Sequence, residues 1–368
     1  MVACIELCRK ASVPVNSSVG YLEFHSSKEI FTMNESPIRL GIIGCGIATR
    51  NLHWPAIKAL PDQFKVVAVC NHTRPKAESF TAEVGGAEIF TDHRELLSSG
   101  LVEAILVCLP INVNAEVSAD CLNAGLHVIC EKPLAHDLAP ARELASLAEK
   151  SITILMVGEN YYYRDDYHAA LSVISSGHIG KIFLVQYSAT GTVDHTQSYG
   201  ATVWRQKPVH RGGFVSDAGV HHAATLRLFG GEVARVQAFS KNIHPVIKAE
   251  DNLVASLQFA SGALGSYSVT YTATDAPHST TLRIFGTEGT IDIGHGELRV
   301  SGQHAFSKKH EPFDNGMSNQ WRTFYEAVRH GKHFPSTPRA CLADQELVWA
   351  MLDSADTGKI IDCPSHKP

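Results

Sequence analysis

A lysine that follows a hydrophobic segment is the first residue of this sequence with a clear chemical use. Lys132 comes two residues after the apolar run Leu126–Cys130. If this run is a strand of a parallel sheet, Lys132 lies at the carboxyl end of the sheet, where such folds bind their ligands. Its ammonium group could bond a hydroxyl or carbonyl oxygen and stabilise developing negative charge. A surface lysine at a strand end is the alternative interpretation.

A carboxylate and an imidazole form the second candidate. Asp217 and His221 stand four residues apart in a segment that predicts a helix, so they share one face. A carboxylate beside an imidazole fixes its tautomer and increases its basicity, which suits a general base. A metal pair or a structural histidine would give the same spacing, but no third zinc ligand stands at a convincing distance. Lys132, Asp217 and His221 are therefore candidate catalytic residues, while we interpret His222 as structural and expect no metal site.

A glycine-rich turn is the third candidate. The apolar run Ile38–Ile43 leads into Gly44-Cys45-Gly46-Ile47-Ala48-Thr49, and a predicted helix follows. Gly44 permits a tight turn, Gly46 lets the backbone approach a pyrophosphate, and the helix start offers free N–H groups. Thr49 replaces the usual third Gly or Ala. After a strand and before a helix, this loop predicts a dinucleotide site that includes Gly44, Gly46, Ala48 and Thr49.

The end of the second predicted strand bears on the identity of the dinucleotide. Asn71 stands where NAD-binding proteins place an acidic residue for the ribose 2′-hydroxyl. Thr73 and Arg74 could receive a 2′-phosphate, although a solvated arginine at a helix start would look the same. The sequence favours NADP(H) over NAD(H) and leaves NAD(H) open.

Two different textures along the chain predict two domains. Between Pro37 and Val157, continuous apolar runs alternate with amphipathic segments, which predicts a parallel sheet covered on both faces. That is a doubly wound α/β Rossmann domain over 37–157. From 158 to 368, alternating strand-like segments joined by short turns predict an α+β domain with an antiparallel sheet, suited to substrate binding or oligomerisation. Residues 1–36 do not resemble core and are expected to be a poorly ordered tail, with Met33 as an alternative translation start.

Composition excludes several other classes of protein. The 368 residues are 44% hydrophobic and 19% charged with a net charge of -5, which points neither to nucleic acid nor to a phospholipid surface. No apolar run reaches the length of a membrane span. The nine cysteines include no CxxC pair, so we interpret them as small buried residues in a reducing, cytoplasmic compartment.

Taken together, these motifs resemble those of a known family, the glucose–fructose oxidoreductase/inositol dehydrogenase/MocA (Gfo/Idh/MocA) oxidoreductases. The resemblance begins near residue 37 and continues to the C-terminus. Its marks are Gly44–Gly46, Glu131-Lys132-Pro133, Gly158–Tyr161, Trp204-Arg205, Gly212–His221, Glu250-Asp251, Phe285–Thr290 and Asp353–Gly358.

The resemblance implies a Rossmann domain followed by a domain with a large open, mostly antiparallel sheet, assembled as a homodimer or homotetramer. It implies that Lys132 contacts substrate and cofactor, that Asp217 and His221 complete the site, and that His221 exchanges the hydroxyl proton. Residues near the nicotinamide half of the cofactor would be Pro110, Asn112, Glu131, Asn160, Trp204 and Arg205. Asn114 departs from the histidine of many relatives, which would alter substrate contacts.

Several functions are compatible with these residues. The first is NAD(P)-dependent hydride transfer on a sugar, inositol or related cyclic polyol. A NAD-dependent glycoside-cleaving enzyme and a non-catalytic dinucleotide-binding sensor are the alternatives. The substrate pocket is predicted to be lined by Tyr161, Tyr163, Arg164, Asp194, His195, Arg205 and His210.

Overall fold

The computed structural model describes residues 36–208, 210–274, 276–311 and 313–364. The tail predicted for residues 1–36 therefore lies outside the described residues, apart from Ser36. Within the described ranges, no helix combines the length and the apolar character needed to cross a membrane.

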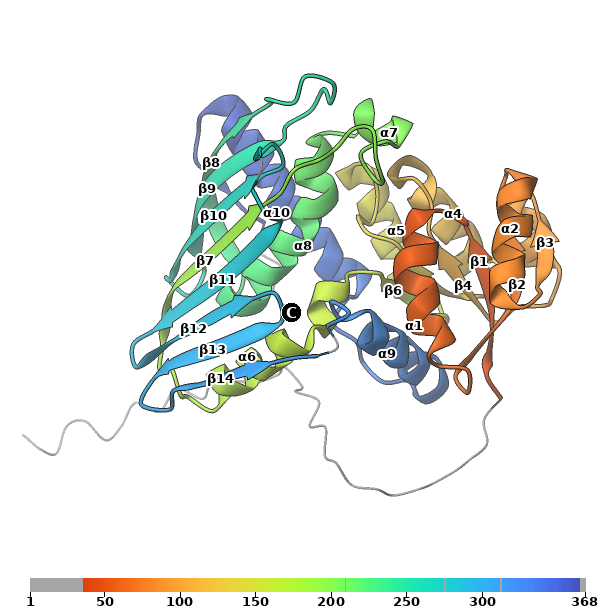
Figure 1. Cartoon of the computed structure of the whole chain (residues 1–368), viewed down its shortest axis with the longest axis horizontal. Helices are drawn as coiled ribbons and strands as arrows, with labels where there is room; N and C mark the ends of the chain where they lie inside the picture. Colours follow the sequence, from red (N-terminus) through yellow and green to blue (C-terminus); the bar gives the residue numbers. More distant parts are fainter. Residues whose placement is uncertain (1–35, 209, 275, 312, 365–368) are drawn as a thin grey trace, which may run out of the picture. The chain divides into compact units, whose positions relative to one another are not determined.

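The first sheet has six parallel strands in the order β3-β2-β1-β4-β5-β6, the order of a doubly wound fold (Figure 1). The strands are β1 Ile38–Ile43, β2 Phe64–Cys70, β3 Glu88–Phe90, β4 Ala104–Val107, β5 His127–Cys130 and β6 Leu155–Val157. The predicted parallel sheet is confirmed. The sequence analysis missed β3, because three residues are too short for a periodic pattern.

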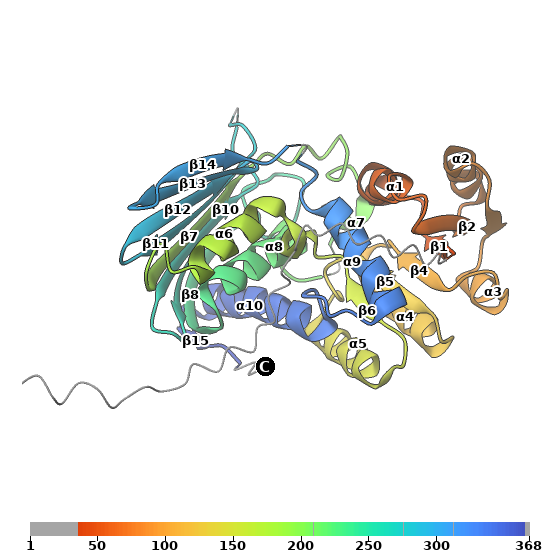
Figure 2. The same ribbon diagram turned by 90° about the horizontal axis from the view of Figure 1, so that it is seen from below.

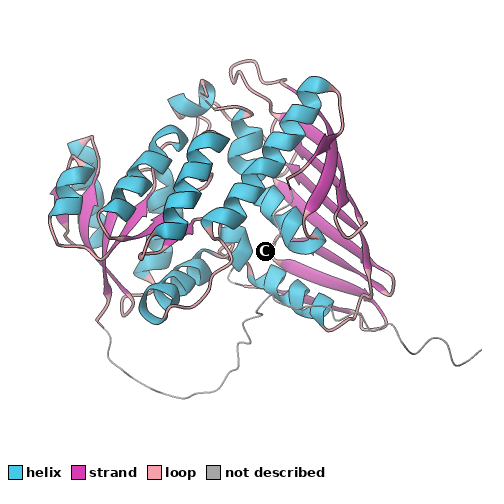
Figure 3. Cartoon of the chain, turned by 180° about the vertical axis from the view of Figure 1, so that it is seen from behind, coloured by secondary structure: helices cyan, strands magenta, loops and turns pink. Residues whose placement is uncertain are grey.

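Helices connect these strands and cover the sheet on both faces (Figure 3). They are α2 Arg74–Val84, α3 His93–Ser98, α4 Ile111–Asn123 and α5 Leu138–Lys150. The first connection is helical from Ile47 to Lys58 and contains a π-helical turn, η1 Thr49–His53, before α1 Trp54–Lys58. Such π turns occur often at functional sites.

The second sheet has nine strands in the order β14-β13-β12-β11-β7-β10-β9-β8-β15. Only β7 and β10 pair in parallel, so the prediction of a mostly antiparallel sheet is confirmed. The strands are β7 Ile182–Thr190, β8 Val233–Lys241, β9 Asn252–Phe259, β10 Leu264–Thr270, β11 Ser279–Gly286, β12 Gly289–Gly294, β13 Glu297–Gly302, β14 Phe306–Lys309 and β15 Ile361–Asp362.

One face of this sheet is covered by helices and the other is not (Figure 2). Strand β9 shows the reason, because its residues alternate between buried and exposed along its whole length. The covering helices include α8 Gly213–Gly230 and α10 Pro338–Thr357, which are buried on most of their surface. The remaining helical elements are η2 Asn160–Tyr163, α6 Asp165–Ser175, α7 Val203–Gln206 and α9 Met317–His330.

Helix α9 follows β14 of the second sheet in sequence but packs into the core of the first. The indole ring of Trp321 is fully buried and meets Phe64 of β2 edge to face, with ring centroids 5.1 Å apart. Such aromatic pairs add to the free energy of burial. The chain thus returns to the first sheet after strands β7 to β14, and this return brings α9 to His53 at the end of η1.

The carboxyl ends of β5 and β6 lie side by side, and this arrangement positions the site. Cys130 pairs with Val157 in the parallel ladder, and the Gly158 nitrogen donates to the Cys130 carbonyl oxygen at 2.6 Å. A Cβ atom at position 158 would lie only 3.2 Å from that oxygen, so glycine permits the close approach. Lys132 and Glu159 come two residues after Cys130 and Val157, so both lie at the same edge of the sheet.

Candidate active site

The glycine loop has the conformation that a dinucleotide site requires. Gly44 has a φ of +100°, and a Cβ atom there would collide with the Cys108 carbonyl oxygen. Around Gly46, in contrast, no atom lies within 4 Å of an added Cβ, which leaves open space beside the backbone. Thr49 is fully buried, and its hydroxyl donates to the Gly44 carbonyl oxygen at 2.6 Å. The Thr49 side chain therefore stabilises the conformation of the glycine loop through this hydrogen bond.

An open pocket of about 420 Å³ lies beside this loop. Its basic residues are Arg50 and Lys76. The lining residues are Cys45, Gly46, Ile47, Arg50, Asn51, Pro75, Lys76 and Ser79. Space beside Gly46, free N–H groups at a helix start and two cations fit the pyrophosphate and ribose of a dinucleotide.

The residues predicted to select the dinucleotide are placed differently from one another. Asn71 is buried, and its side chain accepts from the Cys45 nitrogen at 3.2 Å and donates to the Thr73 carbonyl oxygen at 3.1 Å. It therefore braces the glycine loop. Arg74 begins α2 and pairs with Glu78 at 3.0 Å, in an exposed position.

Lys132 and Arg205 together clamp the carboxylate of Asp217. The Lys132 Nζ donates to the Asp217 carbonyl oxygen at 2.8 Å and to Oδ1 at 3.2 Å, and the Arg205 Nε donates to Oδ2 at 2.7 Å. Burial raises the pKa of Asp217, but the two cations outweigh burial and hold it well below its usual range. Two positive charges facing one negative charge leave this cluster with a net positive charge.

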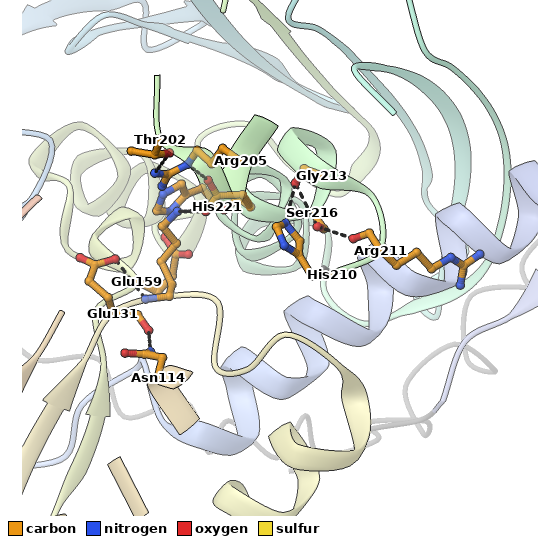
Figure 4. A network of polar contacts seen from close by, with 12 residues as sticks. Asn114, Glu131, Glu159, Thr202, Arg205, His210, Arg211, Gly213, Ser216 and His221 are labelled. Atoms are coloured by element: carbon orange, nitrogen blue, oxygen red, sulfur yellow. Dashed lines mark hydrogen bonds and ion pairs between the residues drawn. The ribbon is translucent and has the colours of Figure 1, made fainter. Parts of the chain in front are cut away.

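His221 is oriented by a different carboxylate from the one predicted. Its Nδ1 lies 2.5 Å from Oε1 of Glu159, which follows β6, and the contacts lie within the network of Figure 4. Asp217 and His221 are one turn apart on α8, as predicted, but both Asp217 oxygens face the cations. The prediction that Asp217 fixes the tautomer of His221 is therefore wrong. The tertiary fold brings the Glu159 carboxylate into contact with the imidazole, whereas the Asp217 carboxylate, one turn away on α8, contacts the two cations.

A second histidine supports the segment that carries Lys132. The Trp321 indole donates to Nδ1 of His53 at 3.2 Å, so His53 carries its hydrogen on Nε2, which lies 2.7 Å from Oε1 of Glu131. The other Glu131 oxygen accepts from the Lys132 nitrogen at 3.1 Å. Burial raises the pKa of Glu131, but the bond from His53 and the nearby charges lower it below its usual range. Glu131 is thus held as an anion.

The remaining predicted cofactor residues have varied surroundings. Asn114, which the resemblance linked to substrate contacts and not to the cofactor, is buried and donates to the Glu131 carbonyl oxygen at 2.5 Å, so it braces the lysine segment. Asn160 donates to the Asn315 carbonyl oxygen at 2.7 Å. The ring of Trp204 lies under the guanidinium of Arg205, at 3.9 Å. Pro110 and Asn112 are exposed at the start of α4.

Part of the predicted substrate lining lies inside the protein. The hydroxyl of Tyr163 lies 2.7 Å from that of Ser336, and Arg164 forms a buried pair with Asp166 at 2.6 Å. Both side chains are buried in the protein. His210 is also buried, with Nε2 3.2 Å from the Gly213 carbonyl oxygen, whereas Asp194 is exposed and His195 is partly exposed. Tyr161 stacks on the imidazole of His221, with centroids 4.6 Å apart.

His222 is structural, as interpreted from the sequence. It is buried on α8, with Nδ1 2.8 Å from the Tyr267 hydroxyl. Burial lowers its pKa to about 3, and the nearby His221 and Lys132 contribute. Across the described part of the chain, no cluster of three His, Cys, Asp or Glu side chains could hold a metal ion.

Two residues of the site were missed by the sequence analysis, and one of them left a signal. Glu159 stands two residues after a predicted strand, as Lys132 does, so adjacent strand ends could have predicted their proximity. His53 left no such signal, because its indole partner Trp321 comes from the far end of the chain.

Comparison with known proteins places these features in context. A family model described as "Oxidoreductase family, NAD-binding Rossmann fold" matches residues 38–159, and one described as "GFO/IDH/MocA C-terminal domain" matches residues 167–292. An oxidoreductase from Thermotoga maritima is 35% identical in sequence, with a TM-score of 0.83 over 89% of this chain and 98% of that one.

Two further relatives have more specific names. The WlbA dehydrogenase from Bordetella pertussis, crystallised with NADH and UDP-GlcNAcA, is 25% identical, with a TM-score of 0.79 over 89% of this chain and 99% of its own. A 1,5-anhydro-D-fructose reductase from Ensifer adhaerens is 28% identical over 69% of this chain and 74% of its own.

Proposed function

We propose, from the premise that this chain belongs to the Gfo/Idh/MocA family of oxidoreductases, that it transfers a hydride between a nicotinamide dinucleotide and an oxygen-bearing carbon of a sugar, inositol or related cyclic polyol. The observation that carries the proposal is the cationic Lys132–Asp217–Arg205 cluster beside the imidazole of His221. A positive cluster and a proton acceptor are what the oxidation of a hydroxyl group needs.

Each residue of the proposed site has a separate task. When bound, the nicotinamide supplies the hydride acceptor or donor. Lys132 holds the reacting oxygen and stabilises the negative charge that develops on it. Asp217 fixes Lys132 in place through two hydrogen bonds. His221 accepts the hydroxyl proton during oxidation and returns it during reduction.

The substrate class is proposed from the relatives and from the chemistry around His221. One relative is named a reductase of an anhydro sugar, and another was crystallised with a nucleotide sugar. Tyr161 stacks on the imidazole, and Arg205 pairs with Asp217 one turn earlier on α8. Such aromatic and polar groups suit a polyol.

The test is a turnover screen with both dinucleotides across D-glucose, myo-inositol, other aldoses and keto-sugars. With the best substrate, we expect Lys132→Ala and His221→Ala each to lower kcat by about 100-fold or more. Arg339→Ala is the control, because Arg339 pairs with Glu149 on the surface. Wild-type kcat in both site variants would reject the assignment.

We further propose that NADP(H) is preferred over NAD(H). Support comes from the absence of a carboxylate at Asn71 and from the cations Arg50 and Lys76 in the pocket beside the loop. Lys76→Ala and Arg74→Ala should identify the cation that contacts the 2′-phosphate, by weakening NADPH binding about 10-fold and leaving NADH binding unchanged. An unchanged NADPH-to-NADH affinity ratio in both variants would reject these two cations as the phosphate contact, and equal wild-type affinities for NADPH and NADH would contradict the preference.

A homodimer or homotetramer is proposed to form through the uncovered face of the nine-stranded sheet. Phe239 and Val254 are cross-strand neighbours on that face and are 67% and 58% exposed, and Leu264 of β10 is 56% exposed. An apolar sheet face of this kind suits a self-complementary interface. Light scattering should give a mass above 40.0 kDa that falls in Phe239→Lys/Val254→Lys but not in Ile360→Lys.

A further inference from the structure

We propose that Glu159 is a positioning residue that acts through His221. Its carboxylate keeps the hydrogen of the imidazole on Nδ1, so that Nε2 is the atom that takes the substrate proton, and it balances the imidazolium charge that results. This inference rests on the proposed function, because it needs His221 as the acid and base. The sequence motifs assigned this role to Asp217, and the geometry points to Glu159.

The contact between Glu159 and His221 is short and buried. Oε1 of Glu159 lies 2.5 Å from Nδ1, and the Glu159 residue is only 1% exposed. The same oxygen accepts from the Tyr161 nitrogen at 3.2 Å, as the cap of the 3₁₀ turn η2. An ionised carboxylate only accepts hydrogen bonds, so Nδ1 must donate. Backbone and ring together therefore hold the carboxylate in one orientation.

The plane of the imidazole is fixed from a second direction. Tyr161 stacks on the ring with an interplanar angle of 15° and a centroid distance of 4.6 Å. Tyr161 is itself held edge-on by Tyr167 at 6.2 Å and lies 5.0 Å from the Arg164 guanidinium. These contacts stabilise one orientation of the ring, because exchanging its two nitrogens would break the contact with Glu159. Nε2 therefore stays directed away from Glu159.

The distribution of charge supports the same assignment. Both Asp217 oxygens already accept from Lys132 and Arg205, so Asp217 has little capacity left to balance a charge on His221. Among the residues that the structure describes, His221 is the only basic side chain within ion-pair distance of Glu159. The other Glu159 oxygen is buried and has no hydrogen-bond partner there. When the imidazole becomes protonated, its positive charge compensates the negative charge of this buried carboxylate.

The chemical step is balanced as follows. During oxidation, the O–H bond of the substrate breaks and its proton forms a bond with Nε2 of His221. The C–H bond of the same carbon breaks, and its two electrons leave with the hydride to the oxidised dinucleotide. Glu159 takes no proton in this step, so its contribution is electrostatic and orientational, as a carboxylate makes to a histidine base.

The first experiment needs no substrate. In protein labelled with ¹⁵N-histidine, two-bond ¹H–¹⁵N correlation spectra distinguish the two tautomers, and the His221→Ala spectrum identifies the resonances of His221. We expect a neutral His221 with hydrogen on Nδ1 in the wild type, and a mixture of tautomers in Glu159→Gln. Hydrogen on Nε2 in the wild type would overturn the proposal, since Glu159 would then be the donor.

The second experiment uses kinetics with the best alcohol of the screen. Glu159→Gln should lower kcat about 100-fold, increase the solvent isotope effect on kcat, and leave the dissociation constants of NADPH and NADH within about 2-fold. In a His221→Ala background, adding Glu159→Gln should change kcat less than about 2-fold, because the two residues act as one unit. A structural role would instead lower dinucleotide affinity and act equally in both backgrounds.

The outcomes separate this inference from the proposed function. If His221→Ala keeps wild-type kcat, the proposed acid and base is wrong. If His221→Ala loses activity but Glu159→Gln keeps it, the proposed function stands and the role of Glu159 is rejected.

Discussion

The carboxylate of Asp217 should be the most costly single charge to remove from the site. It is 5% exposed and balances two cations, with Lys132 Nζ at 3.2 Å and Arg205 Nε at 2.7 Å. Breaking a buried ion pair by removing one partner costs about 3–5 kcal/mol, because the other charge is left without compensation. Asp217→Asn keeps one acceptor oxygen, so we expect the lower end, about 3 kcal/mol, or more than about 100-fold in the unfolding constant.

A matched arrangement far from the site provides the control. Glu103 precedes β4 and also faces two cations, Arg39 and Arg329, each at 3.2 Å. Its side chain is 29% exposed, so solvent screens the charges and Glu103→Gln should cost at most about 1 kcal/mol. Urea denaturation at pH 7, followed by tryptophan fluorescence, measures both free energies of unfolding. Only Asp217→Asn should also lower kcat.

A double variant tests the physical reason for the loss. If Asp217→Asn destabilises the protein by leaving Lys132 and Arg205 without a counter-charge, removing one cation as well should relieve it. Adding Arg205→Gln should then recover about 1–2 kcal/mol of the lost free energy of unfolding. A loss below about 0.5 kcal/mol in Asp217→Asn, or no recovery in the double variant, would refute the reasoning.

Two further predictions concern pH and the glycine loop. Burial lowers the pKa of His222 to about 3, so below pH 6.5 the unfolded chain binds a proton that the folded chain does not bind. The free energy of unfolding should therefore fall by up to about 1.4 kcal/mol per pH unit. Urea denaturation of wild type and His222→Gln at several pH values tests this, and parallel pH curves for the two proteins would contradict it. Gly44→Ala should cost about 2 kcal/mol or more, because Cβ meets the Cys108 carbonyl oxygen at a positive φ. Gly46→Ala should keep its denaturation midpoint but weaken NADPH binding in a fluorescence titration; loss of stability at position 46 would show that the loop is packed and not open.

The local patterns of the sequence determined the elements and part of the site. Continuous apolar runs predicted the parallel strands, and alternation predicted β9 from Asn252 to Phe259, because burial on two faces or on one leaves a direct trace in residue type. The motifs also predicted the family, which the comparisons confirm. Lys132, Asp217 and His221 were found because each lies at a strand end or on one helix turn.

Only the tertiary structure decided which groups contact one another. Glu159 and not Asp217 meets His221, since adjacent strand ends bring Glu159 to the ring while two cations occupy Asp217. Trp321 supports the Glu131 segment through His53, a contact between residues whose separation in sequence carries no periodic signal. A hydrogen bond depends on distances of a few tenths of an ångström, and these are set by the packing of whole sheets and helices. Residue spacing can therefore nominate the chemical groups, but the packed fold selects their partners.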